Sequence, residues 1–95
     1  MHMIIGILQI ELFIPHSQSL KSKRSVLKSI KDRVHNQFNA SISETEYQNK
    51  WQRSVLSIVS VSNEKKYLEG MLAKVERLIE GYFEVQIIDR LLEFI

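Results

Sequence analysis

The apolar residues of this 95-residue chain recur at two different spacings, and the order of these spacings limits the fold more than any other feature. Residues 4–14 are apolar at nearly every even position, which is the period of a strand. Residues 51–61 and 84–92 also alternate, and they are rich in β-branched or long apolar side chains. Two segments between these strands instead place apolar residues three or four apart, which predicts two amphipathic helices.

The first helix is predicted to follow Pro15. Ser17 or Ser19 can accept a hydrogen bond from the free amides of its first turn, and residues 36–40 are expected to end it. One side of this helix is apolar and is predicted to pack on a sheet: Leu20, Leu27, Ile30, Val34 and Phe38.

The second helix has the clearest amphipathic pattern of the chain. Ser62-Asn63 predicts its start and Gly81 its end. Between the helices, residues 41–47 predict a polar edge strand. The turn Gln48-Asn49-Lys50 is expected to join this strand to residues 51–61 as a hairpin.

The predicted order is β-α-β-β-α-β, and two helices of this length cover only one face of a four-stranded antiparallel sheet. The sequence therefore predicts an α+β fold, the ferredoxin-like sandwich. Right-handed crossovers place the first and third strands at the centre of the sheet. A chain of this size supports one modest core, so we expect a single domain over residues 1–95, with Met1-His2 resembling a cloning remnant.

Composition excludes several classes of chemistry. The chain has no cysteine, which excludes a disulfide framework, a thiolate metal site and a cysteine nucleophile. Its histidines have no ligand partner at metal-binding spacing, and neither a nucleophile nor an apolar pocket can be recognised. Glu44 and Glu46 are instead expected to pair with Arg53 across the hairpin. We therefore expect no metal, no cofactor and no enzymatic activity.

No run of about 18 apolar residues exists, and the first residues lack the features of a signal peptide. We therefore expect a soluble, cytoplasmic protein without a membrane partner.

Positive charge is concentrated along the first helix, between Gln18 and His35, where six Lys or Arg are opposed by Asp32 alone. Residues 1–53 contain eight Lys or Arg against four Asp or Glu, whereas residues 54–95 contain five against seven. Five basic residues follow one another at steps of three or four and share one helix face: Lys21, Arg24, Lys28, Lys31 and His35. This basic stripe suits the phosphates of RNA, although a merely solvated helix face explains it equally well and is more common.

Lys23 lies nearer the apolar side of the helix, where its methylene groups are expected to cross the sheet edge. We still count Lys23 and Arg53 with Lys21, Arg24, Lys28 and Lys31 as candidate nucleic-acid-binding residues. Base stacking on the sheet is not expected, because residues 5–10 and 53–61 contain no aromatic side chain.

A second candidate surface consists of Trp51, Gln52 and Phe94. Trp51 stands beside Arg53, a combination that is frequent at interaction hot spots, although packing of Trp51 at the end of the sheet is the favoured interpretation. Phe94 belongs to the apolar tail, residues 91–95, and the central strands are apolar on both faces. One uncovered sheet face would then be partly apolar, which predicts a homo-oligomer, with a dimer as the first expectation. The alternative is that the tail folds back over the sheet.

Four segments together resemble one family of bacterial proteins. They are Ser19-Leu20-Lys21-Ser22-Lys23-Arg24-Ser25-Val26, Ser41-Ile42-Ser43-Glu44, Trp51-Gln52-Arg53 and Val61-Ser62-Asn63. The combination is similar to the YlxP-like family of small proteins of unknown function, over nearly the whole chain. The resemblance implies a ferredoxin-like fold. Because genes of the family often lie near those of translation initiation and ribosome maturation factors, it also implies a link to RNA.

The sequence thus favours a non-enzymatic binding or accessory protein that associates with RNA or the ribosome through its basic first helix. One alternative is an ACT-like regulatory module, which binds a small ligand at a dimer interface beside Pro15–Ser19. Another is a purely structural adaptor. Binding through the helix should depend steeply on salt, whereas a small-ligand site should depend on it much less.

Overall fold

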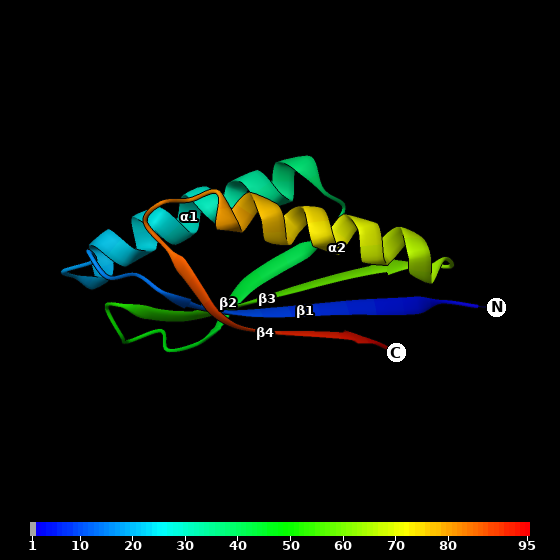
Figure 1. Ribbon diagram of the computed structural model, residues 1–95, viewed down its shortest axis with the longest axis horizontal. Helices are drawn as coiled ribbons and strands as arrows, with labels where there is room; N and C mark the ends of the chain where they lie inside the picture. The colour runs from blue at the N-terminus through cyan, green and yellow to red at the C-terminus, as the bar shows by residue number, and fades with distance from the viewer. Residues whose placement is uncertain (1) are drawn as a thin grey trace.

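The computed structural model describes residues 2–95, so the interpretation of Met1-His2 as a cloning remnant partly lies outside the described residues. The chain forms six elements in the predicted order: β1 (Ile4–Phe13), α1 (Leu20–Gln37), β2 (Ser41–Glu46), β3 (Arg53–Ser62), α2 (Lys65–Glu80) and β4 (Gln86–Phe94). All four strands pair antiparallel in the spatial order β2-β3-β1-β4, and both helices lie on one face of the sheet (Figure 1). The ferredoxin-like α+β fold is confirmed, with β1 and β3 at the centre.

The molecule is elongated, with extents of 47 × 21 × 18 Å. The strands run along its length (Figure 1). One end carries the start of α1 and the loop between β2 and β3, while both termini lie toward the other end. This arrangement places the surface around the start of α1 and the surface around the termini at opposite ends of the molecule.

The core lies between the sheet and the helices. Leu8, Ile10 and Leu12 of β1 are fully buried, and they point toward the helices because alternate residues of a strand face opposite sides. They pack in one core with buried apolar residues of both helices, of β3 and of the loops. These are Ile14, Leu27, Ile30, Val34, Leu56, Ile58, Leu68, Met71, Leu72, Val75, Ile79 and Val85.

The helix starts differ in how well the sequence predicts them. Ser19 is the N-cap of α1, and its Oγ accepts a hydrogen bond of 2.9 Å from the amide of Ser22, as expected. The N-cap of α2 is Glu64 rather than Ser62 or Asn63, and its side chain makes no capping bond. β3 continues through Ser62, whose Oγ accepts from the amide of Glu64, so the strand extends further than predicted and α2 begins later.

Two glycines have opposite roles, and alanine substitutions should separate them. At Gly6 an added Cβ would lie 2.9 Å from Cδ1 of Leu72, because α2 approaches β1 closely there. Gly70 lies within α2 with nothing within 4 Å of such a Cβ. We expect Gly6→Ala to lower the free energy of unfolding by about 1 kcal/mol or more through overpacking. Gly70→Ala should raise it by about 0.5–1 kcal/mol through helix propensity.

Chemical denaturation of both variants beside the wild type measures these changes. Stabilisation by Gly6→Ala would contradict the close approach of α2 to β1.

The tail does not fold back over the sheet, which corrects that alternative. Residues 86–94 form the edge strand β4 beside β1. The amide of Ile95 donates to the carbonyl of Ile5 at 2.9 Å, and the amide of Ile5 donates to the carbonyl of Ile95 at 2.8 Å. The sheet face opposite the helices therefore stays uncovered.

Candidate functional site

The candidate site is the end of the molecule where α1 begins. We call it the loop end and define it as residues 14–24, which hold the β1–α1 loop and the first turn of α1, together with residues 47–53, which hold the β2–β3 loop. Most of the candidate residues lie here or on the continuing face of α1. The two loops are joined by side chains of Lys23 and Gln52.

Lys23 is a structural residue, which corrects its prediction as a nucleic-acid contact. Its side chain is fully buried. Its Nζ donates to Oε2 of Glu44 at 2.9 Å and to the carbonyl of Tyr47 at 2.7 Å. The carbonyls of Arg53 and Gln48 lie at 3.2 and 3.3 Å. An ammonium group has three donors, so these four oxygens satisfy it completely and leave nothing for a phosphate.

The β2–β3 loop has an unusual backbone at the residue that Lys23 holds. Tyr47 has a backbone φ of 63°, in the left-handed region that residues other than glycine rarely adopt. The register of β2 against β3 shifts between Glu44 and Glu46, just before it. Such a conformation costs of order 1–2 kcal/mol and persists only where other contacts fix it. The bond from Lys23 to the Tyr47 carbonyl is one such contact.

Arg53 does not pair with the hairpin carboxylates, contrary to expectation. Its guanidinium forms an ion pair with Glu11 of β1 and lies 4.3 Å from the centre of the Tyr47 ring. The hydrogen bond with Glu11 is the main reason that the pKa of Arg53 is raised above its ordinary value. Arg53 therefore stays charged, but its contacts are within the protein. Glu44 instead accepts hydrogen bonds from Lys23 and from Oγ of Ser54 at 2.8 Å.

Gln52 is exposed, but its side chain also has a positioning role. Its Nε2 donates to the carbonyls of Pro15 and Ser17 at 3.0 and 3.1 Å, and its own carbonyl accepts from the amide of Ile14 at 2.8 Å. These bonds fasten the β1–α1 loop to the β2–β3 loop. In the segment Pro15–Ser19, where an ACT-like ligand would sit, the carbonyls of Pro15 and Ser17 are therefore already bonded to Gln52, and that of Ser19 accepts from the amide of Lys23.

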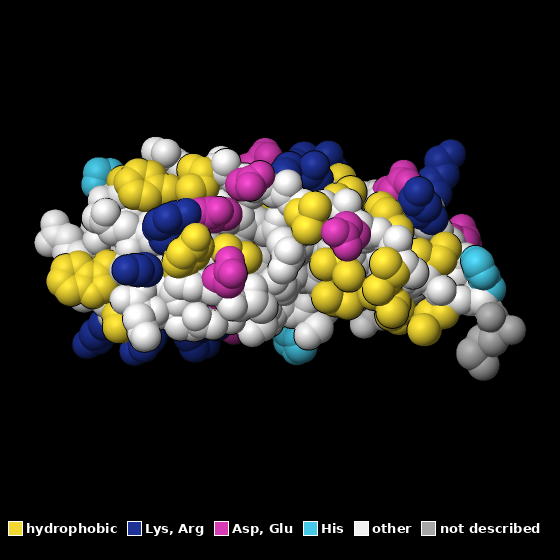
Figure 2. Space-filling model, turned by 90° about the horizontal axis from the view of Figure 1, so that it is seen from below, with side chains coloured by type: hydrophobic (Ala, Val, Ile, Leu, Met, Phe, Trp, Pro, Cys, Tyr) yellow, Lys and Arg dark blue, Asp and Glu magenta, His cyan; other side chains and the backbone are white. Residues whose placement is uncertain are grey.

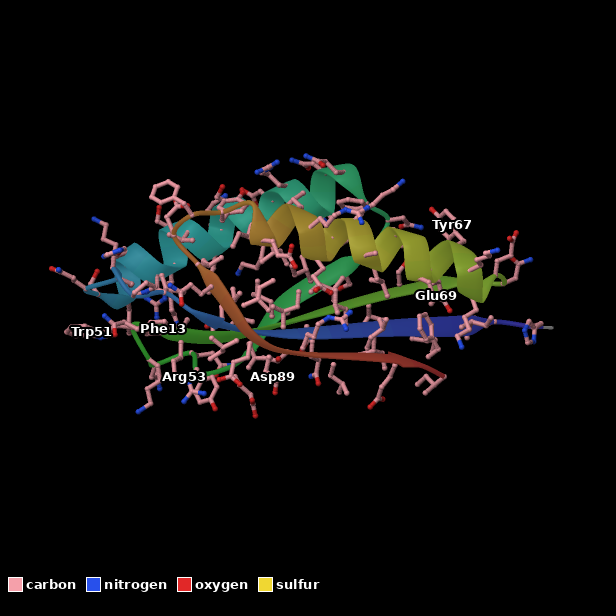
Figure 3. All side chains as sticks on the ribbon, in the orientation of Figure 1. Phe13, Trp51, Arg53, Tyr67, Glu69 and Asp89 are labelled. Atoms are coloured by element: carbon pink, nitrogen blue, oxygen red, sulfur yellow. The ribbon has the colours of Figure 1, made fainter. Side chains whose placement is uncertain are left out.

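Trp51 is exposed to 55%, so the favoured interpretation of packing at the sheet end is wrong. It lines an open depression of about 430 Å³ with Phe13, Lys50, Gln52 and Arg53. Figure 3 shows Trp51 and Phe13 together at the loop end. Lys50 and Phe13 are not among the candidate residues that the sequence predicts for an interaction surface. The strand period does indicate that Phe13 lies on the same face of β1 as Glu11. The register then pairs it with Arg53.

The basic stripe lies on the flank of α1 that points away from α2. Residues on the other flank contact the end of α2: Ser29 hydrogen bonds to the hydroxyl of Tyr82 at 2.9 Å, and the guanidinium of Arg33 lies 5.3 Å from the same ring. Lys21, Arg24, Lys28 and His35 are exposed and Lys31 is half-buried. Lys28 pairs with Asp32 at 2.6 Å on the surface, a contact that is easily exchanged for another anion.

Figure 2 shows basic side chains gathered around the loop end. Lys21 and Arg24 belong to the first turns of α1 within this end, and Lys50 follows in the β2–β3 loop. Aromatic and cationic side chains are therefore presented together at this end, on the β2–β3 loop and on the first turns of α1, which the hydrogen bonds of Lys23 link.

Phe94 does not belong to this surface. It faces the helices, where its Cε1 would lie 3.4 Å from a Cβ at residue 6, and Nζ of Lys65 lies 5.2 Å from the centre of its ring. This corrects the prediction of Phe94 as an interaction residue. β4 continues through residue 94, and the alternation of its side chains turns Phe94 toward the helices.

Within residues 2–95, no helix is long and apolar enough to cross a membrane. The same residues bring together no group of three or more His, Cys, Asp or Glu side chains that could hold a metal ion.

Comparison with known proteins identifies the family. Residues 5–91 match the model of a protein family of unknown function, DUF503. The chain is also 42% identical over 83 residues to the uncharacterized protein YlxP of Bacillus subtilis (strain 168), an alignment that covers 87% of this chain and 90% of that protein. The YlxP-like resemblance is thereby confirmed, and the chain belongs to the DUF503 family of proteins of unknown function.

Proposed function

We propose that this protein is a non-enzymatic accessory protein that binds single-stranded RNA, such as exposed segments of ribosomal RNA, at the loop end. The observation that carries the proposal is the exposed Trp51 on a fixed loop, at the same end as Lys50 and the basic first turns of α1. A flat aromatic side chain can stack on any unpaired base, and neighbouring cations can neutralise the phosphates on either side.

The internal contacts of the loop end support this role. Lys23 and Gln52 hold the two loops together, so the backbone that carries Trp51 does not have to be ordered when a ligand binds. Pre-ordered contact residues avoid an entropic cost of binding. Phe13 lines the same depression and offers a second apolar surface next to Trp51.

The expected affinity is modest and salt-dependent, because most of it would come from charge. Lys21, Arg24, Lys28 and Lys50 supply about four phosphate contacts. For single strands, four contacts predict a loss of roughly 50-fold in affinity between about 50 and 200 mM salt. An ACT-like small-ligand site, the other candidate for this end, would lose far less.

Substitution of Trp51 tests the stacking contact. We expect Trp51→Ala to weaken binding of a labelled single-stranded 12-nucleotide RNA by about 1–3 kcal/mol, or roughly 5- to 150-fold in Kd, whereas Trp51→Phe should retain most of the affinity. Fluorescence anisotropy measures both. Trp51 is the only tryptophan of the chain, so quenching of its emission reports the same contact directly.

Tyr67→Ala is the matched control, because Tyr67 is an aromatic residue on α2 with a similar exposure of 57%. It should bind RNA like the wild type. Equal affinity of Trp51→Ala and the wild type would contradict the proposal, as would an equal loss in the Tyr67→Ala control.

A further inference from the structure

The uncovered face of the sheet is divided along its length. Because the register of the strands is known, the residues of this face can be read as rows across β3, β1 and β4. The first two rows, nearest the termini, are Val61, Ile5 and Ile95, then Val59, Ile7 and Glu93. The next two rows are Ser57, Gln9 and Leu91, then Val55, Glu11 and Asp89.

The apolar end of this face is exposed. We define it as Ile5, Ile7, Val59, Val61, Leu91 and Ile95. Val61, Leu91 and Ile95 are exposed to 51%, 46% and 69%, and Figure 2 shows hydrophobic side chains gathered on this half of the face. Isolated exposed apolar residues are ordinary, but a contiguous group on three adjacent strands usually marks an interface.

The other half of the face is polar and acidic. An open depression of about 570 Å³ lies there, and its lining includes Glu11, Glu46 and Asp89 against one basic residue, Arg90, which already pairs with Glu76. Arg53 neutralises Glu11 alone. Two copies stacked with these halves in contact would bring like charges together, which is unfavourable. Two copies related by a twofold axis through the apolar end would instead keep their acidic halves far apart.

We propose that the apolar end is the interface of a homodimer in which two copies of this chain stack face to face about a twofold axis. A second copy fits because the patch is self-complementary: the two rows nearest the termini are apolar except for Glu93, which lies beside Ile7, and Leu91 follows in the next row beside Gln9. Each row presents branched aliphatic side chains that pack against the same kind of side chain in a twofold contact. This proposal is independent of RNA binding, since the loop end lies at the opposite end of the molecule (Figure 1).

The small size of the patch predicts a weak dimer. Three strands about 4.8 Å apart and five residues of about 3.4 Å each give a patch of roughly 250 Å² in plan. This is well below the interface of a permanent dimer, so a Kd of the order of micromolar or weaker is expected. The protein should therefore exchange between monomer and dimer as its concentration changes.

Sedimentation equilibrium over roughly 1 to 500 μM tests the proposal. The wild type should shift from the 11.2 kDa of one chain toward twice that mass. Val61→Glu should remain monomeric, because it places a charge on the twofold contact. Phe83→Glu is the matched control: Phe83 is 89% exposed but lies outside the sheet, so this variant should dimerise like the wild type.

Two results would overturn the proposal. One is a wild type that stays monomeric at every concentration. The other is dimerisation of Val61→Glu at wild-type strength, which would move the contact to the β4 edge or elsewhere, because Val61 lies on the central strand β3. Neither result affects RNA binding, since Val61→Glu should bind a short RNA with the wild-type Kd per chain.

Discussion

Replacing Lys23 by methionine is expected to lower the free energy of unfolding by about 3 kcal/mol. Methionine fills much of the same volume, but it donates no hydrogen bond to Glu44 or to the carbonyls of the β2–β3 loop. Glu44 is only 14% exposed, so its charge would lose its partner while largely removed from water. Breaking a buried pair on one side costs more than the pair itself contributes.

The measurement is urea denaturation followed by far-ultraviolet circular dichroism. In a domain of this size, a change of this magnitude should also lower the Tm by roughly 15 °C. Lys21→Met is the matched control, because Lys21 is exposed two residues earlier and its substitution should change stability by less than about 0.5 kcal/mol. A Lys23→Met protein as stable as this control would show that Lys23 does not hold the loop.

Reversing three charges on α1 should nearly abolish RNA binding. The variant Lys21→Glu, Arg24→Glu, Lys28→Glu removes about three of the four expected phosphate contacts and replaces them with repulsion. We expect Kd at low salt to rise by about 100-fold or more. The slope of log Kd against log salt should fall by about 2, because each lost contact contributes about 0.7.

The chain offers a control with the same change in net charge. Lys66→Glu, Lys74→Glu, Arg77→Glu reverses three exposed basic residues of α2. If the loop end and its helix bind RNA, this control keeps most of the affinity and the full salt slope. Equal losses in both variants would mean that only net charge matters, and the basic stripe would then be an ordinary solvated helix face.

The fold could be predicted from the sequence because the two hydrophobic periods are clear in every element. In β1, for example, Leu8, Ile10 and Leu12 define the buried face by alternation alone. The element ends were less predictable. β3 begins at Arg53 rather than at Trp51, because residues 47–52 form the loop that Lys23 and Gln52 hold in place.

The candidate site could be predicted only in part. The basic face of α1 follows from helical spacing, but the partners of Lys23 lie 21 to 30 residues away and depend on how the hairpin folds. A signal was present, since Lys23, Leu27 and Ile30 share one stripe of the helix. The partner of Arg53 was not predictable, because the register of β1 against β3 decides that Glu11 rather than Glu46 lies within reach.

The most direct test of RNA binding at the loop end is a map of amide chemical shifts. A 95-residue protein labelled with ¹⁵N can be titrated with an unlabelled single-stranded 12-nucleotide RNA at low salt. We predict that the largest shifts fall on residues 47–53, on the first turns of α1 and on the Trp51 indole. Shifts centred on the open face of the sheet, or no shifts at a saturating excess of RNA, would contradict this account.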